Sequence, residues 1–133
     1  MSRYVYPAIF TKEESGLISV EFPDFDACFT QGNGLEDSLD MARDVLELTL
    51  CDMEDNGIKA PTPSEPTGIK TETNAFVSLV CADTTAYRKK YSGRAVKKTL
   101  TIPEWLNVAA ENQNVNFSMT LQNALMEQLN IRQ

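Results

Sequence analysis

Patterns of apolar and polar residues predict four β-strands in the N-terminal part of the chain. The segment from Arg3 to Thr11 carries apolar side chains on both faces, and the polar turn Lys12–Gly16 separates it from a second strand, so the two predict a hairpin. Pro7 indicates an edge position or a bulge, because proline cannot donate to a strand ladder. The strands are predicted over Arg3–Thr11, Leu17–Phe22, Ala27–Gln31 and Ala75–Ala82, the last of them central in the sheet.

A long helix is predicted over Leu35–Asn56, because apolar residues recur there at helical spacing and Gly57 suits the helix end. Its apolar stripe comprises Leu35, Leu39, Ala42, Leu46, Leu50 and Met53. The segment Ile58–Asn74 contains prolines and is expected to be a surface connection. A short helix capped by Asp83 or Thr84 is expected to reach Tyr91. The order β-β-β-α-β predicts a small α+β domain over residues 1–91.

The C-terminal part begins with an alternating stretch, Val96–Pro103, which predicts a strand with one apolar and one polar face. Val96, Leu100 and Ile102 share the apolar face, and Lys97, Thr99 and Thr101 share the polar face. Two short helices follow, one starting near Glu104 and one capped by Asn116. A segment of about 40 residues rarely buries a core alone. We therefore expect a homodimer in which two such strands pair as an antiparallel ribbon, which fits the major groove of DNA.

This segment resembles the ribbon-helix-helix DNA-binding fold in its outward basic-Thr-Thr row, its apolar-Pro strand end and the Asn116-Phe117-Ser118 start of the second helix. In that fold the N-terminus of the second helix binds a backbone phosphate. We expect Lys97, Thr99 and Thr101 to read base edges, and Arg94 to contact phosphates. Thr101 has an alternative role as the helix cap of a Thr101-x-x-Glu104 capping box. The alternative for the whole segment is an ordinary β-α-α part of a larger core.

The charge is distributed unevenly along the chain. Residues 1–75 carry 5 basic and 15 acidic side chains, and residues 76–133 carry 7 basic and 4 acidic ones. The two parts therefore have net charges of opposite sign, −10 and +3, within a total of −7. Between Tyr87 and Lys98 there are six basic residues and no acidic one. This asymmetry predicts a basic end for nucleic acid and an acidic end for a basic protein.

Composition excludes several other classes of protein. The chain has no histidine, the commonest general base and zinc ligand. Cys28, Cys51 and Cys81 lack metal-binding spacing and are interpreted as buried apolar residues in a reducing compartment, so no metal site is expected. No apolar run is long enough for a membrane span and no signal peptide is evident, so a soluble, cytoplasmic protein is expected.

An ordered series of short motifs covers nearly the whole chain. They are Tyr6-Pro7-Ala8-Ile9-Phe10, Phe22-Pro23-Asp24, Cys28, Thr30-Gln31-Gly32, the Leu35-to-Gly57 helix and Pro61-x-Pro63-Ser64. The series resembles the HicB family of type II antitoxins, although Asp26-Ala27 stands where the family usually has Pro-Gly. The resemblance implies a partial ribonuclease-H-like domain over residues 1–91 and a ribbon-helix-helix domain over residues 92–133, with a hinge at Ser92-Gly93.

The resemblance also implies a function without catalysis. HicB proteins bind HicA, a toxin that cleaves mRNA through a catalytic histidine, and many repress their own operon as DNA-bound dimers or tetramers. For toxin contact we select Asp24, Phe25 and Asp26 from their position in a turn. A ribonuclease-H site needs several carboxylates around two metal ions, and Arg3–Thr11 has none, so no enzyme, metal or cofactor is expected. The alternatives are a stand-alone ribbon-helix-helix regulator whose N-terminal domain senses a ligand or oligomerises, and an orphan DNA-binding protein.

Overall fold

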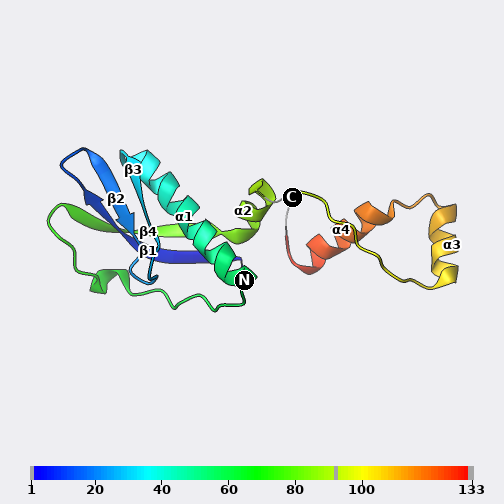
Figure 1. Cartoon of the computed structure of the whole chain (residues 1–133). Helices are drawn as coiled ribbons and strands as arrows, with labels where there is room; N and C mark the ends of the chain where they lie inside the picture. Colours follow the sequence, from blue (N-terminus) through cyan, green and yellow to red (C-terminus); the bar gives the residue numbers. More distant parts are fainter. Residues whose placement is uncertain (1, 92, 132–133) are drawn as a thin grey trace. The chain divides into compact units, whose positions relative to one another are not determined.

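The computed structural model describes residues 2–91 and 93–131, and the chain divides into two compact units, Met1–Arg94 and Ala95–Gln133. The first unit confirms the predicted α+β order (Figure 1). It contains β1 (Arg3–Lys12), β2 (Leu17–Glu21), β3 (Phe29–Asn33), α1 (Leu35–Asp55), the 3₁₀ turn η1 (Pro66–Gly68), β4 (Ala75–Asp83) and α2 (Thr84–Tyr91). The second unit contains α3 (Glu104–Asn112) and α4 (Phe117–Gln128). Ser92 of the expected hinge lies outside the described residues.

The strands form one antiparallel sheet in the order β3-β2-β1-β4. Two predictions of strand position are therefore wrong: β1 is central despite its proline, and the apolar β4 is an edge strand. The position of Pro7 explains the first. β1 pairs with β2 only from Ile9 onward. Pro7 lies opposite Leu79 of β4, at a position where the backbone N–H and C=O groups of β1 point away from β4. The N–H that proline lacks would have found no partner in the sheet.

One face of the sheet is covered by α1, and the core lies between them. On β1, Tyr6, Ala8 and Phe10 alternate toward the helix, as period-two patterning requires, and all three are buried. On α1, Ala42, Leu46 and Leu50 complete the contact, in agreement with the predicted stripe. The other core residues are Ile18, Val20, Phe22, Cys28, Val80 and Ala82.

The first turn of α1 departs from the predicted stripe, because Leu35 and Leu39 are 56% and 46% exposed while Ser38 is fully buried. The cause is the close approach of α1 to β3. A Cβ at Gly32 would lie 2.5 Å from the Cα of Ser38, so only a glycine and a small residue fit at this crossing. The two leucines therefore point away from the sheet.

Further predictions are corrected or confirmed locally. The third strand starts two positions later than expected. Cys81 is exposed rather than buried, because it points to the sheet face opposite α1, between the buried Val80 and Ala82; Cys28 and Cys51 are buried. Gly57 adopts φ 65° just after α1, as a helix terminator does. The Asp83 carboxylate accepts hydrogen bonds from the backbone N–H groups of Thr85 and Ala86, which confirms Asp83 as the cap of α2.

Within the described residues, no helix has the length and apolarity to span a membrane.

In the second unit both predicted helices form, but no strand forms over Val96–Pro103 in the single chain. A strand is defined by its ladder, and the expected ladder partner is a second chain. The Thr101 capping alternative is also wrong, because Pro103 is the N-cap residue of α3 and no side chain caps that helix. Asn116 does cap α4, since its side chain accepts a hydrogen bond of 3.0 Å from the Met119 N–H.

Candidate functional site

The turn between β2 and β3 holds the three residues expected to contact a toxin, and they differ in accessibility. The Asp24 carboxylate accepts hydrogen bonds from the Ser64 N–H, at 3.0 Å, and from the Ser64 hydroxyl. The Phe25 ring packs edge-on against Tyr6, with 4.8 Å between ring centroids, and is half-buried. Asp26 is exposed. Asp24 and Phe25 thus hold the turn in place, and Asp26 is the member that a partner can reach.

The acidic residues of α1 fall into two groups. Glu47 and Glu54 serve the fold: Glu47 is buried and accepts the Asp83 N–H at 2.9 Å, and Glu54 joins α1 to β1 and α2. The remaining side chains are exposed and form an acidic surface on the helix; they are Glu36, Asp37, Asp40, Asp44, Asp52 and Asp55. These six exposed carboxylates give α1 an acidic face.

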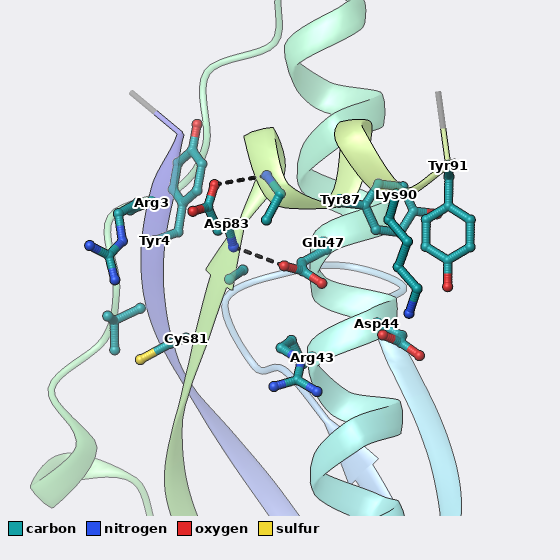
Figure 2. A pocket seen from close by; sticks show the side chains of 13 residues that line it. Arg3, Tyr4, Arg43, Asp44, Glu47, Cys81, Asp83, Tyr87, Lys90 and Tyr91 are labelled. Carbon is teal, nitrogen blue, oxygen red and sulfur yellow. Dashed lines mark hydrogen bonds between the residues drawn. The ribbon is translucent and has the colours of Figure 1, made fainter. Parts of the chain in front are cut away.

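A cavity of about 570 Å³ opens where the end of β4 meets α1 and α2 (Figure 2). Three of its charged lining residues make contacts within the protein. Glu47 and Asp83 hold backbone N–H groups, and Arg43 pairs with Asp40 at 3.1 Å outside the cavity. Tyr87 and Tyr91 contact each other, and the Lys90 ammonium lies 5.2 Å from the centre of the Tyr91 ring. Arg3 and Asp44 are the other charged residues of the lining.

Metal-dependent nuclease chemistry finds no support in the described part of the chain. No group of three or more carboxylate or thiol residues among residues 2–91 and 93–131 could hold a metal ion. β1 carries no carboxylate, and the carboxylate of Asp24, which lies near the end of β2, is hydrogen bonded to Ser64. Among these described residues, the carboxylates are thus not gathered as a two-metal nuclease site requires.

The residues expected to contact DNA lie in two places. Arg94, Lys97, Thr99 and Thr101 lie in the irregular segment 93–103, and all four are exposed. Asn116, Phe117 and Ser118 lie at the N-terminus of α4, where the backbone N–H groups suit an anion. Arg88, the first of the six basic residues before Thr99, is not free for phosphate, because it pairs with Glu54 and Asp55 at 3.1 and 2.9 Å.

Two features of the site were missed from the sequence. The Glu54–Arg88 ion pair joins residues 34 positions apart, and no periodicity predicts such a pair. The Asp24–Ser64 contact was also missed, although both residues lie in the family motifs Phe22-Pro23-Asp24 and Pro61-x-Pro63-Ser64. Their joint presence was a signal that the turn and the connection after α1 contact each other.

Comparison with known proteins agrees with this architecture. A family model described as HicB_like antitoxin of bacterial toxin-antitoxin system matches residues 6–128. Among solved structures, a chain of a toxin-antitoxin complex from Streptococcus pneumoniae is 28% identical with a TM-score of 0.61, covering 95% of this chain and 99% of that one. The antitoxin HicB3 is 25% identical with a TM-score of 0.51, covering 98% of this chain and 100% of that one.

A further structure, the antitoxin HicB from Burkholderia pseudomallei, shares the fold at 16% identity, with a TM-score of 0.54 and coverage of 95% of this chain and 98% of that one. Comparison with curated proteins gives no significant match. The family model spans most of the chain and includes residues of both units. The chain therefore belongs to the HicB-like antitoxins of bacterial toxin-antitoxin systems, a family of non-enzymatic proteins.

Proposed function

We propose that this protein binds and inhibits a HicA-like, mRNA-cleaving toxin through its N-terminal unit and represses its own operon through a C-terminal dimer bound to operator DNA. The observation that carries the proposal is the family match over residues 6–128, which reaches into both units. The Streptococcus pneumoniae relative, similar over nearly its whole length, comes from a toxin-antitoxin complex, which supports the same role here.

The charge of the N-terminal unit supports toxin binding. Residues 1–94 carry 9 basic and 16 acidic side chains, and a toxin that binds mRNA needs a basic surface for phosphates. Complementary charge accelerates association and orients the partners. Asp26 is the proposed direct contact, and Asp24 and Phe25 support it by holding the turn.

The test is an RNA-cleavage assay with the toxin encoded by the neighbouring reading frame. Wild-type protein is expected to abolish cleavage, and Asp26→Lys is expected to require at least ten times more protein for half-inhibition. Glu14→Lys is the matched control, because it makes the same charge change in the exposed β1–β2 turn. Equal inhibition by both variants would remove the β2–β3 turn from the interface. Failure of the wild type to bind the toxin while it still binds DNA would favour a stand-alone regulator.

The C-terminal unit supports dimerisation. No residue of α3 or α4 is buried in the single chain, and Val96 and Trp105 are 81% and 71% exposed. Apolar surface on this scale marks an interface, and a second copy of the same unit supplies a self-complementary partner. Pairing of the two Val96–Pro103 segments would place both copies of Lys97, Thr99 and Thr101 on one ribbon.

The DNA proposal is tested by gel shift with the promoter of the operon. The double variant Lys97→Ala/Thr99→Ala is expected to lose specific binding and to remain dimeric, because both side chains are exposed and apart from the apolar residues. Lys70→Ala/Thr71→Ala removes the same two side-chain types from the N-terminal unit and should bind as the wild type does. An unchanged shift with the first variant would refute the ribbon assignment.

A further inference from the structure

The cavity where the end of β4 meets α1 and α2 has the size of a small-molecule site. Its volume of about 570 Å³ falls within the range of about 300–1,000 Å³ that such sites cover. None of its lining residues belongs to the β2–β3 turn or to the residues expected to contact DNA. The cavity is therefore separate from both surfaces of the proposed function.

Two residues of α1 present opposite charges to this cavity. Arg43 and Glu47 lie four positions apart, on neighbouring turns of one helix face, where opposite charges usually pair. Here the Arg43 guanidinium lies 3.1 Å from the Asp40 carboxylate, and within the described residues no ion pair joins it to Glu47. Figure 2 shows both side chains on the side of α1 that faces β4. The cavity thus has an acid and a base, about one helical turn apart, that do not neutralise each other.

The Glu47 carboxylate is held in place with one oxygen open to the cavity. The residue is 8% exposed, and its Oε2 accepts the Asp83 N–H at 2.9 Å. Oε1 has no hydrogen-bond partner within the described residues, yet no fully buried side-chain oxygen there lacks one, so Oε1 is accessible. A fixed and accessible carboxylate oxygen is a preorganised acceptor for an ammonium group.

Two aromatic rings of α2 form an apolar wall beside these charges. The ring centroids of Tyr87 and Tyr91 lie 4.7 Å apart, and Tyr91 is 58% exposed. Burial raises the pKa of Tyr87, and the negative charges of Asp44 and Glu47 add to this effect, so both carboxylates act on the region of the rings. Figure 2 shows the two rings next to Glu47. The rings offer contact area for an aromatic or large apolar group.

The balance of charge indicates the class of ligand. The lining has three basic and three acidic residues, and its part on α1 and α2 has two of each. An anion would be repelled by the carboxylates, and a cation by the basic groups. A molecule that carries an ammonium group and a carboxylate side by side is attracted to both sets. α-Amino acids are the common molecules of this kind.

We propose that this cavity binds a free α-amino acid with an aromatic or large apolar side chain. Its ammonium group donates to Glu47 Oε1, its carboxylate accepts from the Arg43 guanidinium, and its side chain packs against the rings of Tyr87 and Tyr91. The guanidinium keeps donors for this contact, because its ion pair with Asp40 uses only one of its nitrogens. The site requires neither toxin nor DNA, so it is tested independently of the proposed function.

The test is an NMR titration of the isotopically labelled full-length chain with L-phenylalanine, L-tryptophan, L-leucine and L-methionine. At least one of them is expected to shift the amide signals of Ala82, Ala86 and Tyr87, with a Kd of about 1 mM or lower. The matched comparison uses the amine and the carboxylic acid that correspond to the tightest ligand, which for phenylalanine are phenethylamine and 3-phenylpropionate. Each should bind about ten times more weakly, because each lacks one charge-assisted contact.

Two variants assign the two charges to their residues. Arg43→Gln should weaken the amino acid about tenfold and leave the amine analogue unchanged, because the amine has no carboxylate for Arg43. Glu47→Gln keeps an oxygen for the Asp83 N–H, and should weaken the amino acid about tenfold while leaving the carboxylic acid analogue unchanged. A residue that only supported the fold would weaken all ligands alike. Lys12→Gln, an equal loss of charge at the far end of β1, is the control and should bind as the wild type does.

Several results would overturn this assignment. One is the absence of any shift with all four amino acids at about 10 mM, well above the expected Kd. Another is a set of shifts confined to residues away from the cavity. Equal binding of the amino acid and both analogues, or an equal effect of Arg43→Gln on every ligand, would show that the two charges are not recognised together.

Discussion

The Glu54 carboxylate joins three elements of the N-terminal unit. It accepts hydrogen bonds from the Tyr4 hydroxyl at 2.8 Å, the Thr84 hydroxyl at 3.0 Å and the Arg88 guanidinium at 3.1 Å. Burial alone would raise the pKa of Glu54, but the donors outweigh it and the pKa is lowered. Burial and the bond to Glu54 raise the pKa of Tyr4 to about 12. The carboxylate is thus held in its charged form.

Glu54→Gln is therefore expected to lower the free energy of unfolding at pH 7 by about 1–3 kcal/mol. Because the folded pKa is below the unfolded one, this stabilisation is complete above the unfolded pKa and disappears as pH falls through the folded pKa. Urea unfolding of both proteins from pH 7 to pH 3 should show the difference narrowing below about pH 5. Glu14→Gln, an exposed control, should show no such convergence, and a constant difference for Glu54→Gln would contradict the assignment.

At the scale of elements, the packing of α1 on β3 depends on Gly32. Gly32→Ala places a Cβ 2.6 Å from the backbone nitrogen of Ser38, so the helix or strand must shift. Overpacking of this kind should lower the free energy of unfolding by about 1–3 kcal/mol in chemical denaturation. Gly68→Ala is the control, because it has open space and no unusual φ. Equal stability of the two variants would show that the α1–β3 contact can relax.

The same contact shows where sequence reasoning reaches its limit. The sequence predicted the existence and order of every strand and α-helix in the N-terminal unit, because periodicity and turn residues are local signals, but it did not predict the 3₁₀ turn η1 in the connection after α1. It misassigned Leu35 and Leu39 because helix orientation depends on a glycine three residues before the helix. The positions of β1 and β4 in the sheet were predicted the wrong way round. Pro7 was taken to indicate an edge strand or a bulge and the apolar content of β4 a central strand, whereas strand position depends on which residues pair across the sheet. Asp24 and Phe25 were placed in the right turn, but their internal contacts could not be seen from the local pattern.

At the scale of the whole molecule, an acidic protein is proposed to bind an acidic polymer, so binding must come from a few local cations. Removal of one phosphate-binding cation should reduce the slope of log binding constant against log salt concentration by about 0.9. A dimer carries two copies of Arg94, so Arg94→Gln should make this slope shallower by about 1.8 and weaken binding to specific and non-specific DNA equally.

Lys97→Ala should instead reduce discrimination between operator and mutated operator by about 1–3 kcal/mol for each base contact. Fluorescence anisotropy titrations at several salt concentrations measure both quantities, with Lys70→Gln as the control. If Arg94→Gln altered base discrimination and left the salt slope unchanged, the roles assigned to these two residues would be reversed.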